Sequence, residues 1–83
     1  MIYPLQIRAA RALLDMSQLE LAERASVGIA TIKRIEAAGM TLVGNARTVA
    51  RIQAALEEAG VEFIESAADR GPGVRLTSVL SRF

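Results

Sequence analysis

Apolar residues recur at intervals of three and four through residues 4–59, the spacing of one face of an amphipathic helix. The pattern predicts a helix over residues 4–14, with Pro4 in the first turn, where its missing amide costs nothing. It predicts another over residues 46–59, which Asn45 caps and Gly60 ends. The expected buried faces are Ile7, Ala10 and Leu14 in the first helix and Val49, Ile52 and Leu56 in the second.

Two shorter helices joined by a tight turn are predicted between these. Ser17 caps the first, and Glu20 completes a capping box. The pattern breaks at residues 26–28 and resumes in a second helix over about residues 28–38, which Gly39 ends as a left-handed cap before a connector over residues 40–44. The expected apolar contacts are Leu19, Leu21 and Ala22 in the first helix and Ile29, Ile32 and Ile35 in the second.

The other side of the second short helix carries two cations between small side chains. Lys33 and Arg34 lie there with Ala30 and Ala37. Lysine and arginine bond guanine edges or phosphates in the major groove, and alanine or isoleucine can meet a thymine methyl group. The predicted base contacts are therefore Ile29, Ala30, Lys33 and Arg34.

The sequence from about Leu5 to Val61 resembles the helix-turn-helix domains of Cro and phage-repressor type, often called XRE-like. The matching residues are Arg11, Ser17, Gln18, Leu21, Ala22, Val27, Ile32, Ile35 and Glu36. The resemblance implies a mainly α, lambda-repressor-like bundle of about four helices that binds DNA. It also implies an ion pair between Arg11 and Glu36, whose alternative is two independent solvated charges, and a phosphate contact from Gln18.

Two residues depart from the family pattern at the turn. Ser26 stands where the family commonly has glycine, and a left-handed backbone there costs a non-glycine residue about 1 kcal/mol, so a slightly remodelled turn is expected. Gly28 stands where the family commonly has a capping serine or threonine, and it offers no hydroxyl to a neighbouring phosphate.

The last third of the chain changes from helical to alternating periodicity. A strand is predicted from Val61 and a second over residues 74–77, after a loop at residues 70–73, so the two form a hairpin. An isolated hairpin is marginally stable and has exposed edges, which favours self-association through residues 61–77. The tail, residues 78–83, is either a frayed terminus or a second adhesive patch. The expected oligomerisation residues are Val61, Phe63, Ile64, Val74, Leu76, Val79, Leu80 and Phe83.

Charge is divided along the chain. Residues 1–56, the greater part of a helix-turn-helix domain expected over residues 1–60, carry seven cations and four acids, whereas residues 57–83 carry three cations and five acids. The basic part coincides with the expected DNA reader. The candidate phosphate contacts are Gln18, Arg8, Arg24, Asn45, Arg47 and Arg51, each of which is also compatible with an ordinary solvated surface.

Composition disfavours catalysis and cofactor binding. The sequence has no cysteine and no histidine, which removes disulfides, thiolate nucleophiles and the usual zinc ligands. Glu57 and Glu58 are adjacent, but neighbouring helix positions point apart and form no acid/base pair. We therefore expect no enzyme, no metal and no cofactor. The chain also has no apolar run long enough to cross a bilayer, so a cytoplasmic, nucleoid-associated protein is expected.

These observations predict a sequence-specific transcriptional regulator of bacterial or phage type that binds double-stranded DNA as a homodimer or larger assembly. RNA polymerase or another regulator is a compatible further partner. The alternative is a protein-interaction module, an antitoxin or co-regulator, that uses the same fold and hairpin to hold a partner protein. The near-neutral net charge of +1 and the apolar tail favour this alternative slightly.

Overall fold

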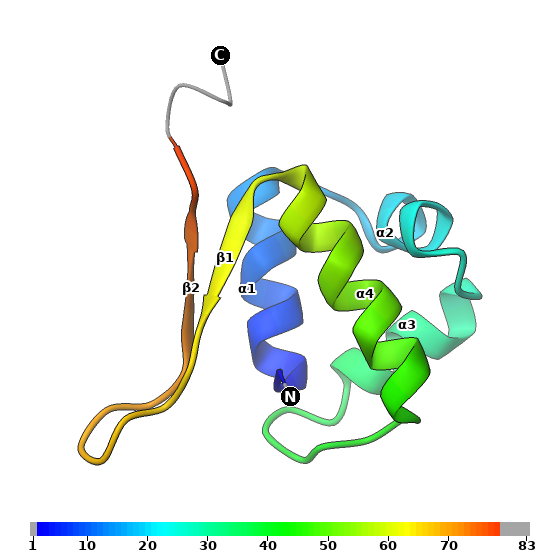
Figure 1. Ribbon diagram of the computed structural model, residues 1–83. Coiled ribbons are helices and arrows are strands. Elements are labelled where there is room, and N and C mark those ends of the chain that lie inside the picture. The colour runs from blue at the N-terminus through cyan, green and yellow to red at the C-terminus, as the bar shows by residue number, and fades with distance from the viewer. Residues whose placement is uncertain (1, 79–83) are drawn as a thin grey trace.

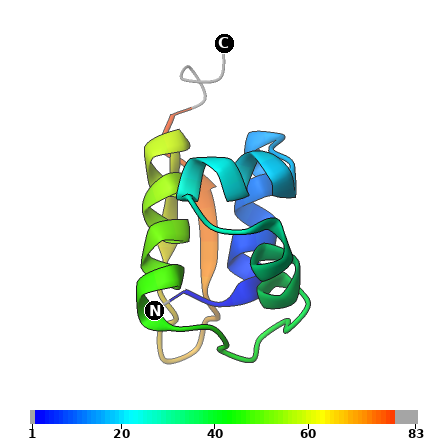
Figure 2. The same cartoon turned by 90° about the vertical axis from the view of Figure 1, so that its right-hand side faces the viewer.

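The helices pack together on one face of a β-hairpin (Figures 1 and 2). The computed structural model describes residues 2–78. The elements, in chain order, are α1 (Pro4–Leu14), α2 (Gln18–Ala25), α3 (Ile29–Glu36), α4 (Ala46–Ala59), β1 (Val61–Ile64) and β2 (Gly73–Leu76). This is the predicted helical bundle followed by a hairpin. The tail residues Val79, Leu80 and Phe83, which were expected to assist self-association, lie outside the described residues.

Local capping explains where the helices begin and end. Ser17 Oγ accepts a hydrogen bond from the Glu20 amide at 3.0 Å, and Asn45 Oδ1 accepts one from the Thr48 amide at 2.8 Å. Gly60 ends α4 with a φ of 118°, a left-handed backbone that glycine adopts without steric cost. These three positions are those that the sequence predicts.

Helix α3 is shorter than predicted. It ends at Glu36, and Ala37 caps it in a right-handed conformation with a φ of −69°. Gly39 does have a left-handed backbone, with a φ of 64°, but it lies in the turn after the helix. Its carbonyl accepts a hydrogen bond from the Leu5 amide at 3.0 Å, so this turn is tied to α1. The prediction that Gly39 caps α3 directly is wrong, because the turn is organised by its contact with α1.

The apolar core draws on every helix and on β1. Its largest fully buried side chains are Pro4, Ile7, Leu21, Ile32, Ile35, Ile52, Leu56 and Val61. Leu19 and Ile29 depart from the predicted pattern, because 55% and 36% of them are exposed. Leu21, Ala22 and Ala25 define the buried side of α2, and Leu19 lies at the margin of that side, three residues before Ala22.

The hairpin is attached to the helices. Val61 pairs with Leu76 and Ile64 with Gly73 in an antiparallel register. The second strand covers residues 73–76, one residue earlier than the predicted 74–77. Gln6 of α1 is buried, and its Nε2 donates to the carbonyls of Ile64 at 3.3 Å and Gly73 at 3.0 Å. Because Val61 is only 2% exposed, its side chain belongs to the core of the protomer and is not available to a second copy.

Within residues 2–78, no helix is long and apolar enough to span a membrane.

Candidate nucleic-acid interface

The exposed face of α3 carries the residues that sequence analysis selected for base contacts. Ile32 and Ile35 are each 1% exposed and anchor the helix, and Glu36 is also buried. Lys33 and Arg34 are exposed, as is Ala30, and Ile29 is 36% exposed at the margin of this face. The helix therefore presents two long cationic side chains to solvent from a rigidly anchored backbone.

The turn between α2 and α3 keeps the left-handed geometry despite its serine. Ser26 has a φ of 56° and a ψ of 46°, and its amide donates to the carbonyls of Ala22 and Glu23. The Val27 amide donates to the Ala22 carbonyl at 3.0 Å. The expectation of a remodelled turn is wrong, because these hydrogen bonds and the burial of the flanking helices hold the serine in a conformation that costs about 1 kcal/mol. Gly28 caps α3 without a side-chain bond, as predicted.

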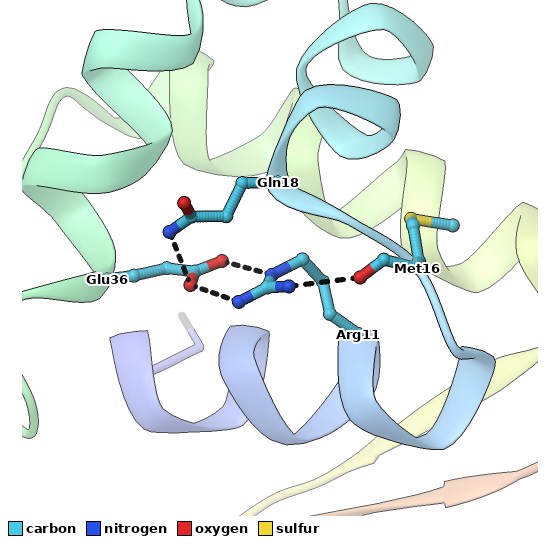
Figure 3. A network of polar contacts seen from close by, with 4 residues as sticks. All are labelled: Arg11, Met16, Gln18 and Glu36. Carbon is cyan, nitrogen blue, oxygen red and sulfur yellow. Dashed lines mark hydrogen bonds and ion pairs between the residues drawn. The ribbon is translucent and has the colours of Figure 1, made fainter.

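A charged network joins α1, α2 and α3 (Figure 3). Arg11 Nε and Nη2 donate to the two carboxylate oxygens of Glu36, each at 2.7 Å, and Arg11 Nη1 donates to the Met16 carbonyl at 3.0 Å. The Glu36 side chain is 4% exposed and that of Arg11 19%. The predicted ion pair is thus formed as a two-pronged contact, the strongest geometry open to arginine and carboxylate.

The hydrogen bond to Glu36 raises the pKa of Arg11 above its ordinary value, more than burial lowers it. Arg11 therefore stays positively charged throughout the physiological pH range.

Gln18 completes the network and is less free than a surface glutamine. Its Nε2 donates to Glu36 Oε1 at 3.1 Å, so the side chain lies against the ion pair at the start of α2 (Figure 3). A shallow depression beside this network is lined by Arg8, Gln18 and Lys33, among others. Three of the predicted DNA-contacting residues, from three helices, therefore gather at one place.

The remaining phosphate candidates lie in two other places. Arg24 and Arg51 line a second depression between α2 and α4, in which Glu58 also takes part. Arg24 is already paired with Glu20 across one turn of helix at 3.1 Å. Asn45 and Arg47 are exposed at the start of α4, where the Asn45 oxygen is used as the helix cap. The basic candidates form a distributed set around α3 rather than one patch.

Two apolar features of the surface were not predicted. Leu19, Val27 and Ile29 line a shallow depression at the outside of the turn. Leu5, Ala9 and Leu13, spaced by four residues, form an exposed stripe along α1, with Leu5 42% and Leu13 39% exposed. The stripe lies on a different side of α1 from Ile7, Ala10 and Leu14, which are buried as the sequence predicts.

Acidic clusters that could hold a metal ion are absent from residues 2–78, where no group of three or more suitable side chains comes together.

Comparison with known families agrees with this geometry. A sequence model of the family described as helix-turn-helix matches residues 7–52, more than half of the 83 residues. The chain therefore belongs to the helix-turn-helix family of XRE/Cro type, a family of DNA-binding regulatory domains and not of enzymes. The matched segment contains α1 from Ile7 onward, all of α2 and α3, and half of α4, so it includes the whole charged network and the cationic face. A search of curated proteins found no significant match.

Proposed function

We propose that the protein is a sequence-specific DNA-binding transcriptional regulator of bacterial or phage type, which acts on the nucleoid as a homodimer or a larger assembly. The observation that carries the proposal is the exposure of Lys33 and Arg34 on α3, whose opposite face is locked into the core by Ile32 and Ile35. A helix held in this way can enter a groove without losing its own packing.

The dimensions of α3 suit the major groove. An α-helix with its side chains is about 10 to 12 Å across, which matches the groove's width of about 12 Å. Lys33 and Arg34 have donors long enough to reach guanine O6 and N7, and Ala30 and Ile29 are apolar partners for thymine methyl groups. This combination favours a site that contains both guanine and thymine.

Contacts to phosphate would hold the helix in register. Arg8 and Gln18 lie beside Lys33 around one depression, which supports backbone contacts on that side of the groove. Arg24, Arg51, Asn45 and Arg47 are exposed candidates on the other sides. If each protomer neutralises about four phosphates, the logarithm of the affinity falls with the logarithm of the salt concentration at a slope of about −3.6, and twice that for a dimer.

A two-fold dimer would place its recognition helices about 34 Å apart on a palindromic site, one turn of duplex. Binding would repress transcription by occlusion or activate it through contact with RNA polymerase or another regulator.

The apolar depression at the turn supports a second candidate function, a protein-interaction module such as an antitoxin or co-regulator. Leu19 is 55% exposed beside Ile29, and an exposed apolar pair is suited to contact with another protein. The two candidates differ in the residues that they require, since protein binding here needs Leu19 and DNA binding needs Lys33 and Arg34.

The experiment that tests the proposal is selection of binding sites from a pool of random duplexes by the purified protein, followed by sequencing. We expect an enriched motif with two related half-sites and binding that weakens steeply with salt. The variant Lys33→Ala with Arg34→Ala should give no enrichment while its thermal melt stays that of the wild type, because both side chains are exposed. No enrichment by the wild-type protein, together with salt-independent binding, would refute the proposal.

A further inference from the structure

The outer edge of β2 is an unpaired strand edge. The Thr77 amide donates to the Gly60 carbonyl at 2.9 Å, which makes Gly60 and Thr77 a hydrogen-bonded pair. Hydrogen-bonded and non-bonded pairs alternate along an antiparallel ladder, so Val74 and Leu76, opposite Phe63 and Val61, direct their backbone N–H and C=O groups away from β1. Within the described residues, β1 is the only strand that pairs with β2.

The apolar stripe of α1 adjoins this edge. Leu5 and Ala9 share a cavity of about 290 Å³ with Met40 of the α3–α4 turn and with Gly73 and Val74 of β2. Beyond the cavity, the same side of α1 continues through the exposed Ala12 and Leu13. A row of backbone hydrogen-bonding groups and a row of small and aliphatic side chains therefore form one continuous surface, which we term the α1–β2 face (Leu5, Ala9, Ala12, Leu13, Val74 and Leu76).

We infer that the α1–β2 face is the surface through which two copies of the chain associate. This inference rests on the homodimer of the proposed function and identifies its interface. Each strand edge offers two amides and two carbonyls, and an antiparallel copy of the same edge offers matching partners, so the edge is complementary to itself. A strand from the second copy satisfies every one of these groups.

The outward backbone groups of Val74 and Leu76 fix the register in which the two β2 strands pair. When Val74 pairs with Leu76 of the partner subunit, and the reverse pair forms across the two-fold axis, all the outward groups of both strands are used. Above the joined strands, the α1 stripes of the two copies meet, and the small side chains of Ala9 and Ala12 allow the helices to approach closely. The resulting interface is isologous, with strand pairing in one layer and helix packing in the other.

This register places the Arg75 side chains of the two copies opposite each other. Arg75 points to the solvent side of the sheet, where it is paired with Glu62. Like charges directly opposite on neighbouring strands are destabilising. If the β2 edges pair in this register, removal of the Arg75 charge should strengthen the dimer.

The arrangement also suits DNA binding. The two-fold axis of an antiparallel edge pair is perpendicular to the sheet, and all four helices lie on one face of the hairpin (Figures 1 and 2). Both copies of α3 therefore lie on the same side of the joined sheet, as two recognition helices on one duplex must.

Sedimentation velocity of the full chain over a concentration series, without DNA, tests the inference. We expect the wild type to dimerise and Ala9→Arg to weaken the dimer by about tenfold or more, because it places a long cation within the α1 stripe where the two copies meet, an effect of about 1.4 kcal/mol. The control Ala54→Arg adds the same side chain at an exposed alanine of α4, away from the α1–β2 face, and should sediment as the wild type does. Arg75→Thr should tighten the dimer, since it removes the like-charge contact and supplies a good strand former.

Three outcomes would overturn the inference. A wild type that stays monomeric at every concentration shows that this face does not bind a second copy. A dimer that Ala9→Arg leaves intact shows that the copies meet elsewhere. A dimer that Arg75→Thr weakens or leaves unchanged shows that the β2 edges do not pair in this way. Circular dichroism melts confirm that each variant is folded, and none of these outcomes bears on site selection by α3, so the DNA-binding proposal is judged separately.

Discussion

The helix-turn-helix unit, residues 18–36, and the hairpin, residues 61–76, are both two short elements joined by a connection, but they are held in place by different means. The helical unit is fixed by side chains, through its buried isoleucines and the ion pair between Arg11 and Glu36. The hairpin is fixed by the burial of Val61, by the partly buried Phe63, Val74 and Leu76, which pack against the core, and by Gln6, which bonds its backbone.

The two regions also expose different chemistry. The helical unit presents the long side chains of Lys33 and Arg34, which suit the reading of base edges. The hairpin presents the backbone groups of Val74 and Leu76, which suit the addition of a strand. The comparison suggests a division of labour in which recognition depends on side-chain identity and assembly on backbone geometry.

Removal of Arg11 should have the largest effect on stability. Arg11→Ala leaves the carboxylate of Glu36 buried without its cation, and breaking a buried pair in this way costs about 3 to 5 kcal/mol. Urea denaturation measures the loss in the free energy of unfolding. Arg24→Ala is the matched control, because its ion pair with Glu20 is exposed and an exposed pair contributes at most about 1 kcal/mol. Equal effects of the two variants would show that the helical unit does not depend on the buried network.

The wild type and Arg11→Ala also test how the contribution of Arg11 to stability depends on pH. Because the folded pKa of Arg11 is raised, its contribution to stability is complete below the unfolded pKa and is lost only in strongly alkaline solution. The difference in unfolding free energy between wild type and Arg11→Ala should therefore be the same at about pH 6 and about pH 9. A difference that shrinks at the higher pH would contradict the raised pKa.

A smaller and more local effect is expected at the hairpin. Gln6→Ala removes the donor to the carbonyls of Ile64 and Gly73 and the acceptor for the Tyr3 amide, a loss of about 1 to 3 kcal/mol. Hydrogen exchange should quicken in β1 and β2 while α2 and α3 keep their protection. Gln53→Ala, which removes only a bond to Glu57 on the same helix, is the control and should leave the strands unchanged. Uniform loss of protection in both regions would show that they are not separately anchored.

The smallest effect is expected at the turn, and it is a gain. Ser26→Gly relieves the left-handed backbone and should stabilise the protein by about 0.5 to 1 kcal/mol. A thermal melt measures the shift. Ser66→Gly makes the same change in the hairpin loop at a residue without a positive φ, and there glycine only adds freedom to the unfolded chain. If Ser26→Gly destabilises the protein, the serine side chain has a role that its hydrogen bonds do not reveal.

Much of the helical region was predictable because its contacts are local and periodic. The spacing of Ile32 and Ile35 assigned one side of α3 to the core, and the caps at Ser17, Asn45 and Gly60 follow from residue chemistry within one turn. The pairing of Arg11 with Glu36 was predictable from their positions at the margins of two apolar stripes and from the family resemblance.

The remaining features depend on contacts between distant parts of the chain. Gln6 lies 58 and 67 residues from the carbonyls to which it donates, and no local sequence pattern predicts hydrogen bonds between residues so far apart. The end of α3 was misplaced for a related reason, since the Gly39 carbonyl is held by Leu5. The exposed stripe of α1 was missed because Ile7, Ala10 and Leu14, the face predicted to be buried, already account for the contacts of α1 with the core, and the position of a further apolar face shows only in the assembled bundle.

The most direct test of the central claim, that the exposed face of α3 reads DNA, is fluorescence anisotropy with the selected duplex and two single-charge variants. Lys33→Ala removes a proposed base contact, and Arg70→Ala removes an exposed cation in the hairpin loop. We predict that Lys33→Ala weakens binding by about fivefold or more, as expected for the loss of a contact of about 1 to 3 kcal/mol, and that Arg70→Ala stays within about twofold of the wild type. Equal losses for both variants would show that the affinity reflects overall charge and would contradict the claim.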